Sequence, residues 1–142
     1  MNLYRLIYMS DAADYIDWED LKDILTKSEK NNAKIDVTGM LVFSDNKFLQ
    51  VLEGPAKNLS SLYAKISQDA RHRNCLLISY TPIHQRVFSA WAMKGVNLAF
   101  MKPEMKQFLV KKYGASGTGI ALPKDEFLAF SVLYDVYHLN QA

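Results

Sequence analysis

The sequence predicts an α+β protein built on a ferredoxin-like βαββαββ domain with a five-stranded mixed sheet. Five segments have the composition and two-residue periodicity of strands, and two segments between them carry apolar residues at helical spacing. The 142 residues, of which 49% are hydrophobic, suit one compact core. A repeated βαβ unit places both helices on one face of such a sheet. We expect this domain to span residues 1–98 and a two-helix extension to span residues 99–142.

Each element of the predicted domain has a local signal in the sequence. The first strand alternates two sets of bulky side chains, so both of its faces are expected to be covered. Asp17 is expected to cap the first helix, and the pair Asp45-Asn46 favours a tight turn between the next two strands. In chain order we predict a strand at 3–10, a helix at 17–32, strands at 37–44 and 47–53, a helix at 58–69, and strands at 76–83 and 91–98.

The opposite face of the sheet needs a cover, which the tail can provide. A short helix is predicted over 103–113, because a proline suits its first turn, and a second helix is predicted over 123–139. Residues 114–119, rich in Gly and Ser, are expected to link the two helices. The aromatic stripe expected to cover the sheet consists of Phe127, Phe130, Tyr134 and Tyr137.

Composition argues against several classes of function. Lys and Arg number 17 against 15 Asp and Glu, and this balance indicates neither a nucleic-acid partner nor a membrane surface. Cys75 is the only cysteine, and the histidines lack metal-ligand spacing, so no disulfide or metal site is expected. No apolar run approaches the roughly 18 residues of a membrane span, and no leader pattern precedes the first strand. We expect a cytoplasmic protein without hydrolytic machinery.

Gln50 and Tyr8 are polar side chains at positions expected to be interior. Gln50 shares a strand face with Phe48 and Leu52, so its amide is buried if that face meets the helices. A buried amide without a partner costs about 1–3 kcal/mol. Tyr8 lies on an inward face of the first strand and is a suitable partner. Taken singly, each residue is better explained as a structural side chain of the core than as a chemical group.

Two helix faces could line a slot for a planar ligand, because both are half apolar and half polar. Lys65 and the run Arg71-His72-Arg73 could hold a phosphate, although cations also suit the C-terminal end of a helix. Asn is likewise favoured at a helix end, so the asparagine pair also has a structural explanation. The two faces consist of Ile24, Ser28, Asn31 and Asn32 on the first helix, and of Leu62, Lys65, Ile66 and Asp69 on the second.

Several separated motifs resemble the landmarks of BLUF domains, the blue-light sensors using flavin. The segment 48–54, Phe-Leu-Gln-Val-Leu-Glu-Gly, is the most specific of them. The tail is similar to that of short BLUF proteins, which carry two helices after the sensor domain. The matching motifs are Leu3 to Ser10, Asn31-Asn32, Val37 to Leu41, Phe48 to Gly54, Asp69 to His72 and Trp91 to Met93.

The resemblance implies a flavin between the two helices, with Tyr8 and Gln50 beside its N5 and C4=O groups. It also implies that Trp91 and Met93, expected on one face of the fifth strand, lie near Gln50 and relay the signal. The cofactor implied is FAD, with FMN as the alternative, and a homo-oligomer and a downstream signalling protein are expected. The implied flavin contacts are Tyr8, Ile24, Ser28, Asn31, Asn32, Phe48, Gln50, Leu52, Lys65, Ile66, Asp69, Arg71 and His72.

The implied function is a photoreceptor, not an enzyme. Excited flavin takes an electron and a proton from Tyr8 through Gln50, and the rearranged hydrogen bonds signal through the sheet and the tail helices. Two other classes stay open. A small hydrolase of the acylphosphatase kind would need a phosphate loop after the first strand, but residues 10–16 hold two acids and no Gly or Arg. An RNA-binding sheet of the RRM type would need exposed aromatics and a basic surface.

Overall fold

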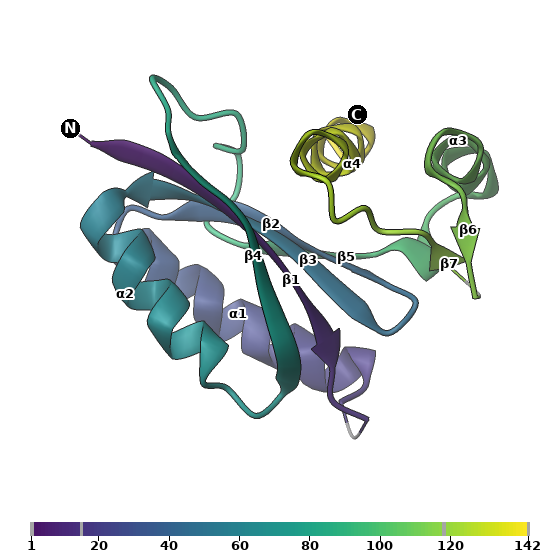
Figure 1. Ribbon diagram of the computed structural model, residues 1–142. Helices are drawn as coiled ribbons and strands as arrows, with labels where there is room; N and C mark the ends of the chain where they lie inside the picture. The colour runs from purple at the N-terminus through teal and green to yellow at the C-terminus, as the bar shows by residue number, and fades with distance from the viewer. Residues whose placement is uncertain (1, 15, 118, 142) are drawn as a thin grey trace.

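A five-stranded sheet lies at the centre of the protein, with helices on both of its faces (Figure 1). The structure is a computed structural model that describes residues 2–14, 16–117 and 119–141. The elements of the domain are β1 (Leu3–Ala12), α1 (Trp18–Lys34), β2 (Thr38–Ser44), β3 (Lys47–Pro55), α2 (Ala56–Ser67), β4 (His72–Pro82) and β5 (Lys94–Asn97). The strand order is β4-β1-β3-β2-β5, in which β5 runs parallel to β2 and the other pairs are antiparallel. This topology confirms the predicted α+β class and βαββαββ order.

The alternation of side chains along β3 divides the core into two halves. Gln50 and Leu52 face α1 and α2, whereas Leu49 and Val51 face the opposite side, where α4 (Glu126–Leu139) packs. Because strand side chains alternate, a shift of one residue would exchange the two sets. The register of β3 therefore decides that Gln50 points toward the two helices, as the sequence predicts.

Two local signals act as the sequence predicts. The Asp17 side chain accepts a hydrogen bond from the Asp20 amide at 2.8 Å, and the Asp20 carboxylate accepts one from the Asp17 amide at 3.4 Å. This reciprocal pair forms a capping box at the start of α1. Asp45 and Asn46 have φ angles of 50° and 62°, the left-handed conformation that a two-residue hairpin turn requires. These features fix where α1 begins and how β2 pairs with β3.

Two strands differ in length from the prediction. β4 begins at His72, because the chain already pairs with the end of β1 there, beyond an irregularity in the ladder. β5 begins only at Lys94, so Trp91 and Met93 lie before the strand. The carbonyl of Ala92 bonds to the Asn32 side chain, which holds this stretch outside the regular ladder. The predicted fifth strand, 91–98, is therefore wrong at residues 91–93 and at Leu98, which begins a short 3-10 helix.

The tail forms two helices and a small hairpin. α3 (Pro103–Tyr113) has the predicted bounds, and α4 begins at Glu126 because Asp125 caps it, accepting a bond from the Leu128 amide at 2.9 Å. The predicted glycine-rich link contains the paired strands β6 (Ala115–Ser116) and β7 (Gly119–Ile120). Figure 1 shows α4 over the sheet, and α3 beside it next to this hairpin.

The face of α4 that meets the sheet is mainly aliphatic, and of the predicted aromatic stripe only Phe130 and Tyr137 pack in this half of the core. Phe127 is 82% exposed and Tyr134 is 44% exposed, so neither covers the sheet. Aliphatic side chains allow the helix to approach the strands closely, which leaves Phe127 and Tyr134 at the margins of the contact. The fully buried residues of α4 are Ala129, Val132, Leu133 and Val136.

Candidate functional site

Tyr8 and Gln50 form a buried polar pair in the middle of the sheet. They are direct partners in the β1–β3 register, and both side chains lie on the face covered by α1 and α2. The Tyr8 hydroxyl donates a hydrogen bond to Gln50 Oε1 over 2.5 Å. Tyr8 is 3% exposed and Gln50 is 7% exposed. A polar group buried to this degree needs a hydrogen-bond partner, and each of the two side chains provides one for the other.

Burial raises the pKa of Tyr8 far above the ordinary value of a phenol, which is about 10. The neighbouring Cys75, Tyr63 and Asp69 raise this pKa further, because each repels a phenolate when it is itself ionised. The neutral phenol is therefore the stable form of Tyr8. It can only act as the donor toward Gln50 Oε1.

The other end of the Gln50 amide also has a partner. Gln50 Nε2 donates to the sulfur of Met93 over 3.3 Å. The amide therefore lies between a phenol that donates and a thioether that accepts. An amide carries one donor group and one acceptor group, so a half-turn of the side chain exchanges their places.

A pocket opens from the Tyr8–Gln50 pair toward the space between α1 and α2. It holds about 590 Å³ of empty space, including the part open to solvent, which is in the range of small-molecule sites. Its walls are mostly aliphatic and aromatic, and its polar groups lie near the sheet and near the end of α2. The lining residues are Tyr8, Ile16, Leu21, Ile24, Leu25, Ser28, Leu41, Phe48, Gln50, Ile66, Asp69, Arg71 and His72.

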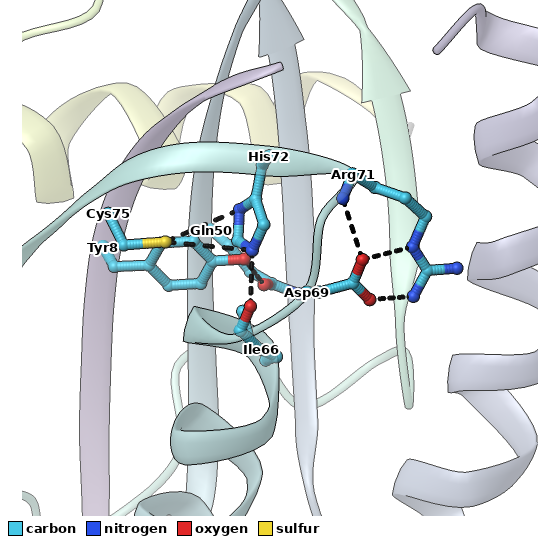
Figure 2. A network of polar contacts seen from close by, with 7 residues as sticks. All are labelled: Tyr8, Gln50, Ile66, Asp69, Arg71, His72 and Cys75. Carbon is cyan, nitrogen blue, oxygen red and sulfur yellow. Dashed lines mark hydrogen bonds and ion pairs between the residues drawn. The ribbon is translucent and has the colours of Figure 1, made fainter. Parts of the chain in front are cut away.

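His72 forms one wall of this pocket beside Tyr8 (Figure 2). Its Nε2 lies 2.5 Å from the carbonyl oxygen of Ile66, which only accepts, so Nε2 carries a hydrogen. Its Nδ1 lies 2.8 Å from the Ser10 hydroxyl, and the two are hydrogen-bonded. These two bonds hold the imidazole edge-on to Tyr8, with ring centroids 6.0 Å apart.

Asp69 and Arg71 form a forked ion pair at the rim of the pocket (Figure 2). Arg71 Nε donates to Asp69 Oδ1 at 2.7 Å, Arg71 Nη2 bonds the other carboxylate oxygen, and the Arg71 amide adds a bond at 2.9 Å. Hydrogen bonds from Arg71 hold the pKa of Asp69 below its usual range, although partial burial opposes them. The rim therefore carries a fixed pair of opposite charges.

Most of the residues predicted to contact a ligand gather around the pocket, but four do not line it. Asn31 is exposed, and Asn32 is buried with its Nδ2 donating to the Ala92 carbonyl at 3.2 Å. Neighbours on a helix point in different directions, so only one asparagine can face inward. Leu52 lies fully in the core and Lys65 is exposed on α2. The predicted residues that line the pocket are Tyr8, Ile24, Ser28, Phe48, Gln50, Ile66, Asp69, Arg71 and His72.

Four apolar lining residues were missed by the sequence analysis. Leu21 and Leu25 follow the same helical spacing as Ile24 and Ser28, so a wider stripe on α1 would have included them. Leu41 is the partner of Gln50 across β2 and β3, which hairpin register could have indicated. Ile16 precedes the helix cap, where no periodic signal operates.

Trp91 and Met93 lie on opposite sides of the sheet, and the prediction of one shared face is wrong. Met93 is 2% exposed beside Gln50 in the core half beneath α1 and α2. Trp91 packs in the other half, with its ring centroid 5.0 Å from that of Tyr137 on α4. Lys94 places its Nζ 4.4 Å from the centroid of the same indole. Because both residues precede β5, the two-residue period of a strand does not apply to them.

No helix among residues 2–14, 16–117 and 119–141 is long and apolar enough to cross a membrane. Within the same residues, no three His, Cys, Asp or Glu side chains are grouped as metal ligands. Cys75 is half-buried, with its sulfur 3.7 Å from His72 Nδ1.

The α+β domain thus holds a buried Tyr–Gln pair beneath two helices, at the inner end of a largely apolar pocket. The family model of BLUF, described as sensors of blue light using FAD, matches residues 3–94. The chain therefore belongs to the BLUF family. The resemblance seen in the sequence motifs is thus confirmed.

Solved structures show the same fold, including the tail. The ground state of BlsA is 29% identical with a TM-score of 0.76, and the match covers 93% of this chain and 85% of that chain. A bacterial light-regulated adenylyl cyclase is 34% identical with a TM-score of 0.74, but there the match covers 78% of this chain and 32% of that one. The match to BlsA thus extends over nearly the whole of this chain.

Curated relatives contain the same domain within much longer proteins. The photoactivated adenylate cyclase subunit alpha of Euglena gracilis is 36% identical over 98 residues, which are 68% of this chain and 10% of that protein. The blue light- and temperature-regulated antirepressor BluF of Escherichia coli strain K12 is 37% identical over 82 residues, 56% of this chain and 20% of that protein. The chain thus spans only a small part of these relatives.

Proposed function

We propose that the chain senses blue light through a flavin held in the pocket between α1 and α2, with Tyr8 as electron donor and Gln50 as hydrogen-bond switch. The observation that carries the proposal is the 2.5 Å bond from the Tyr8 hydroxyl to Gln50 Oε1 at the inner end of the pocket. The pair is buried and its members satisfy each other, so it needs no ligand in order to persist. Its position beside an open, largely apolar space gives it access to a planar ring.

The lining of the pocket suits a flat aromatic ring with one polar edge. Ile24 on α1 and Ile66 on α2 provide apolar contacts, and Gln50 provides a donor and an acceptor toward the sheet. The Ser28 hydroxyl adds a polar group on α1, and His72 adds an aromatic edge. These residue types match what a flavin ring would meet.

Four further residues stay in the proposed flavin site although they do not line the pocket. Asn32 is buried and its amide bonds to Ala92, next to Met93, so it adjoins the Gln50 end of the site. Leu52 lies in the same half of the core as Tyr8. Asn31 and Lys65 are exposed and would reach only the outer part of a ligand, where Asp69 and Arg71 also lie.

The first step is the loss of an electron and a proton from Tyr8. A bound flavin supplies a strong oxidant when it absorbs blue light. Loss of an electron makes the Tyr8 phenol strongly acidic, and its proton moves along the 2.5 Å bond to Gln50 Oε1. The proton is available at neutral pH, because a phenol is protonated there and burial raises the pKa of Tyr8 further.

The second step is a change of hydrogen-bond partners at Gln50. Rotation or tautomerisation of the amide exchanges its donor and acceptor, and the proton and electron return to Tyr8. A new donor then points to the carbonyl edge of the ring, which shifts the absorption of the pigment to longer wavelength. The bond from Gln50 to Met93 changes at the same time. The result is a rearranged site without net chemistry.

The signal is proposed to leave the site through Met93 and Trp91, the sheet and the two tail helices, and to reach a partner protein. Support for a protein partner comes from the E. coli relative, which is named as an antirepressor. We propose FAD as the cofactor, with FMN as the alternative, in a cytoplasmic homo-oligomer. The division into a sensor at 1–98 and an output extension at 99–142 is part of this proposal.

The test is a visible spectrum of the purified chain before, during and after blue illumination. We expect a yellow protein whose flavin bands move reversibly to the red in the light. Flavin released by denaturation and separated by chromatography identifies FAD or FMN. A colourless protein that takes up neither flavin on reconstitution would contradict the proposal.

A further inference from the structure

The irregular segment 86–93, between β4 and β5, is anchored at its start to a buried carboxylate. Glu53 is fully buried, and its Oε1 accepts bonds from the backbone amides of Val87 at 3.0 Å and Phe88 at 2.7 Å. Arg5 Nε donates to Glu53 Oε2 at 2.8 Å, which holds the carboxylate in place. Glu53 and Gln50 lie on opposite faces of β3, so this anchor is on the α4 side of the sheet.

The end of the segment is hydrogen-bonded to polar side chains on the sheet face that carries the pocket. The Ala92 carbonyl accepts a bond from Asn32 Nδ2 at 3.2 Å, and the Met93 sulfur accepts one from Gln50 Nε2 at 3.3 Å. The Trp91 carbonyl accepts a bond from the Gly39 amide at 3.0 Å. The segment thus passes from one face of the sheet to the other, with each end held by side chains.

Tyr137 of α4 meets the middle of this segment. The Ala90 amide donates to the Tyr137 hydroxyl at 2.8 Å. The Tyr137 ring packs edge-on against Phe88 and Trp91, with centroids 5.1 Å and 5.0 Å away. Tyr137 is 4% exposed, so a shift of the segment cannot be absorbed by empty space around the ring.

We propose that Tyr137 is the positioning residue that transmits a change in the hydrogen bonds of Gln50 to α4. The inference rests on the proposed function and adds the receiving residue to it. A change in the bond between Gln50 and Met93 displaces the end of the segment, while Glu53 holds its start. The residues between the Glu53 anchor and Met93 must therefore move, and among them the Ala90 amide is bonded to the Tyr137 hydroxyl. The C-terminal half of α4 then loosens in the light.

The test compares Tyr137→Phe with Tyr134→Phe in the full, flavin-loaded chain. Tyr137→Phe removes the acceptor for the Ala90 amide and keeps the ring. Tyr134 lies on the same helix, is 44% exposed and contacts the Phe130 and His138 rings. The readout is amide hydrogen exchange of residues 132–139 in the dark and under continuous blue light.

We expect the light-minus-dark exchange difference in 132–139 to fall about fivefold in Tyr137→Phe, the factor that one ordinary hydrogen bond contributes to an equilibrium. Tyr134→Phe should keep the native difference, and both variants should keep the red shift. A native exchange difference in Tyr137→Phe, or an equal loss in Tyr134→Phe, would overturn the inference. If Tyr137→Phe does not fold, Trp91→Leu breaks the ring contact from the other side and should also reduce the difference.

Failure of this inference is distinguishable from failure of the proposed function. The visible spectrum is recorded first on the same samples. If the native chain shows no red shift, the proposed function has failed and Tyr137 has no signal to receive. If the red shift is present in every sample and α4 responds without the Tyr137 hydroxyl, only the inference about Tyr137 has failed.

Discussion

Tyr8 and Gln50 stand opposite each other on neighbouring antiparallel strands, joined by a hydrogen bond of 2.5 Å. Residues opposite each other in such a pair share a face, with Cβ atoms about 4.5–5.5 Å apart. The contact therefore depends on the register of β1 and β3 and not on the conformation of a loop. A pair built in this way is held before any ligand arrives, which is what a fast photochemical step requires.

The alkaline limb of the pH dependence tests the burial of Tyr8. Its raised pKa means that the folded protein holds the phenolic proton more tightly than the unfolded chain does, in which phenols titrate near pH 10. The stability from the neutral phenol is fully present below about pH 10 and is lost as the pH rises through the folded pKa. We expect the amplitude of the light-induced red shift to be constant from about pH 7 to pH 9.5. A midpoint below about pH 9 in protein that is still folded would contradict this.

Glu53→Gln is expected to lower the free energy of unfolding by about 3 kcal/mol, because it removes the charge from a fully buried partner of Arg5. The amide would also turn one donor toward the backbone amides of Val87 and Phe88. Urea unfolding followed by circular dichroism gives the value.

The control for this change is Glu19→Gln, which breaks the exposed pair between Glu19 and Lys22. Its expected cost is about 0.5 kcal/mol or less, because water screens such pairs. Equal costs for the two variants would show that the buried carboxylate is not the anchor described above.

Leu133→Ala and Phe127→Ala test which face of α4 meets the sheet. Leu133 is fully buried, so its truncation should cost about 2–5 kcal/mol of unfolding free energy. Phe127 is 82% exposed, and its truncation should change stability by about 0.5 kcal/mol or less. A larger loss of unfolding free energy in Phe127→Ala than in Leu133→Ala would show instead that the predicted aromatic stripe meets the sheet.

Periodicity and turn chemistry predict most of this fold, because each acts over a few neighbouring residues. Asp17 caps α1 and Asp45-Asn46 turns the hairpin as expected. The start of β5 was missed, because the Asn32 side chain takes the Ala92 carbonyl out of the ladder, and this contact joins residues far apart in the chain. Tertiary bonds of this kind leave no local pattern.

Local patterns likewise predict some residues of the candidate site and miss others. Tyr8 and Gln50 could be paired from strand alternation, and the helix spacing identified Ile24, Ser28 and Ile66. The opposite directions of Trp91 and Met93 could not be predicted, since they follow from the irregular backbone before β5. Nor does the sequence reveal that Tyr137 meets the same segment from the other side.

The most direct test of the central claim is the light-minus-dark absorption spectrum of Tyr8→Phe, with Tyr63→Phe as the matched control. Both phenols face the same half of the core, with ring centroids 5.4 Å apart, but the hydroxyl bonded to Gln50 Oε1 belongs to Tyr8. If Tyr8 and Gln50 run the photochemistry, Tyr8→Phe binds flavin and shows no red shift, while Tyr63→Phe keeps it. A full, reversible red shift in flavin-loaded Tyr8→Phe would contradict the assignment of Tyr8 as the donor.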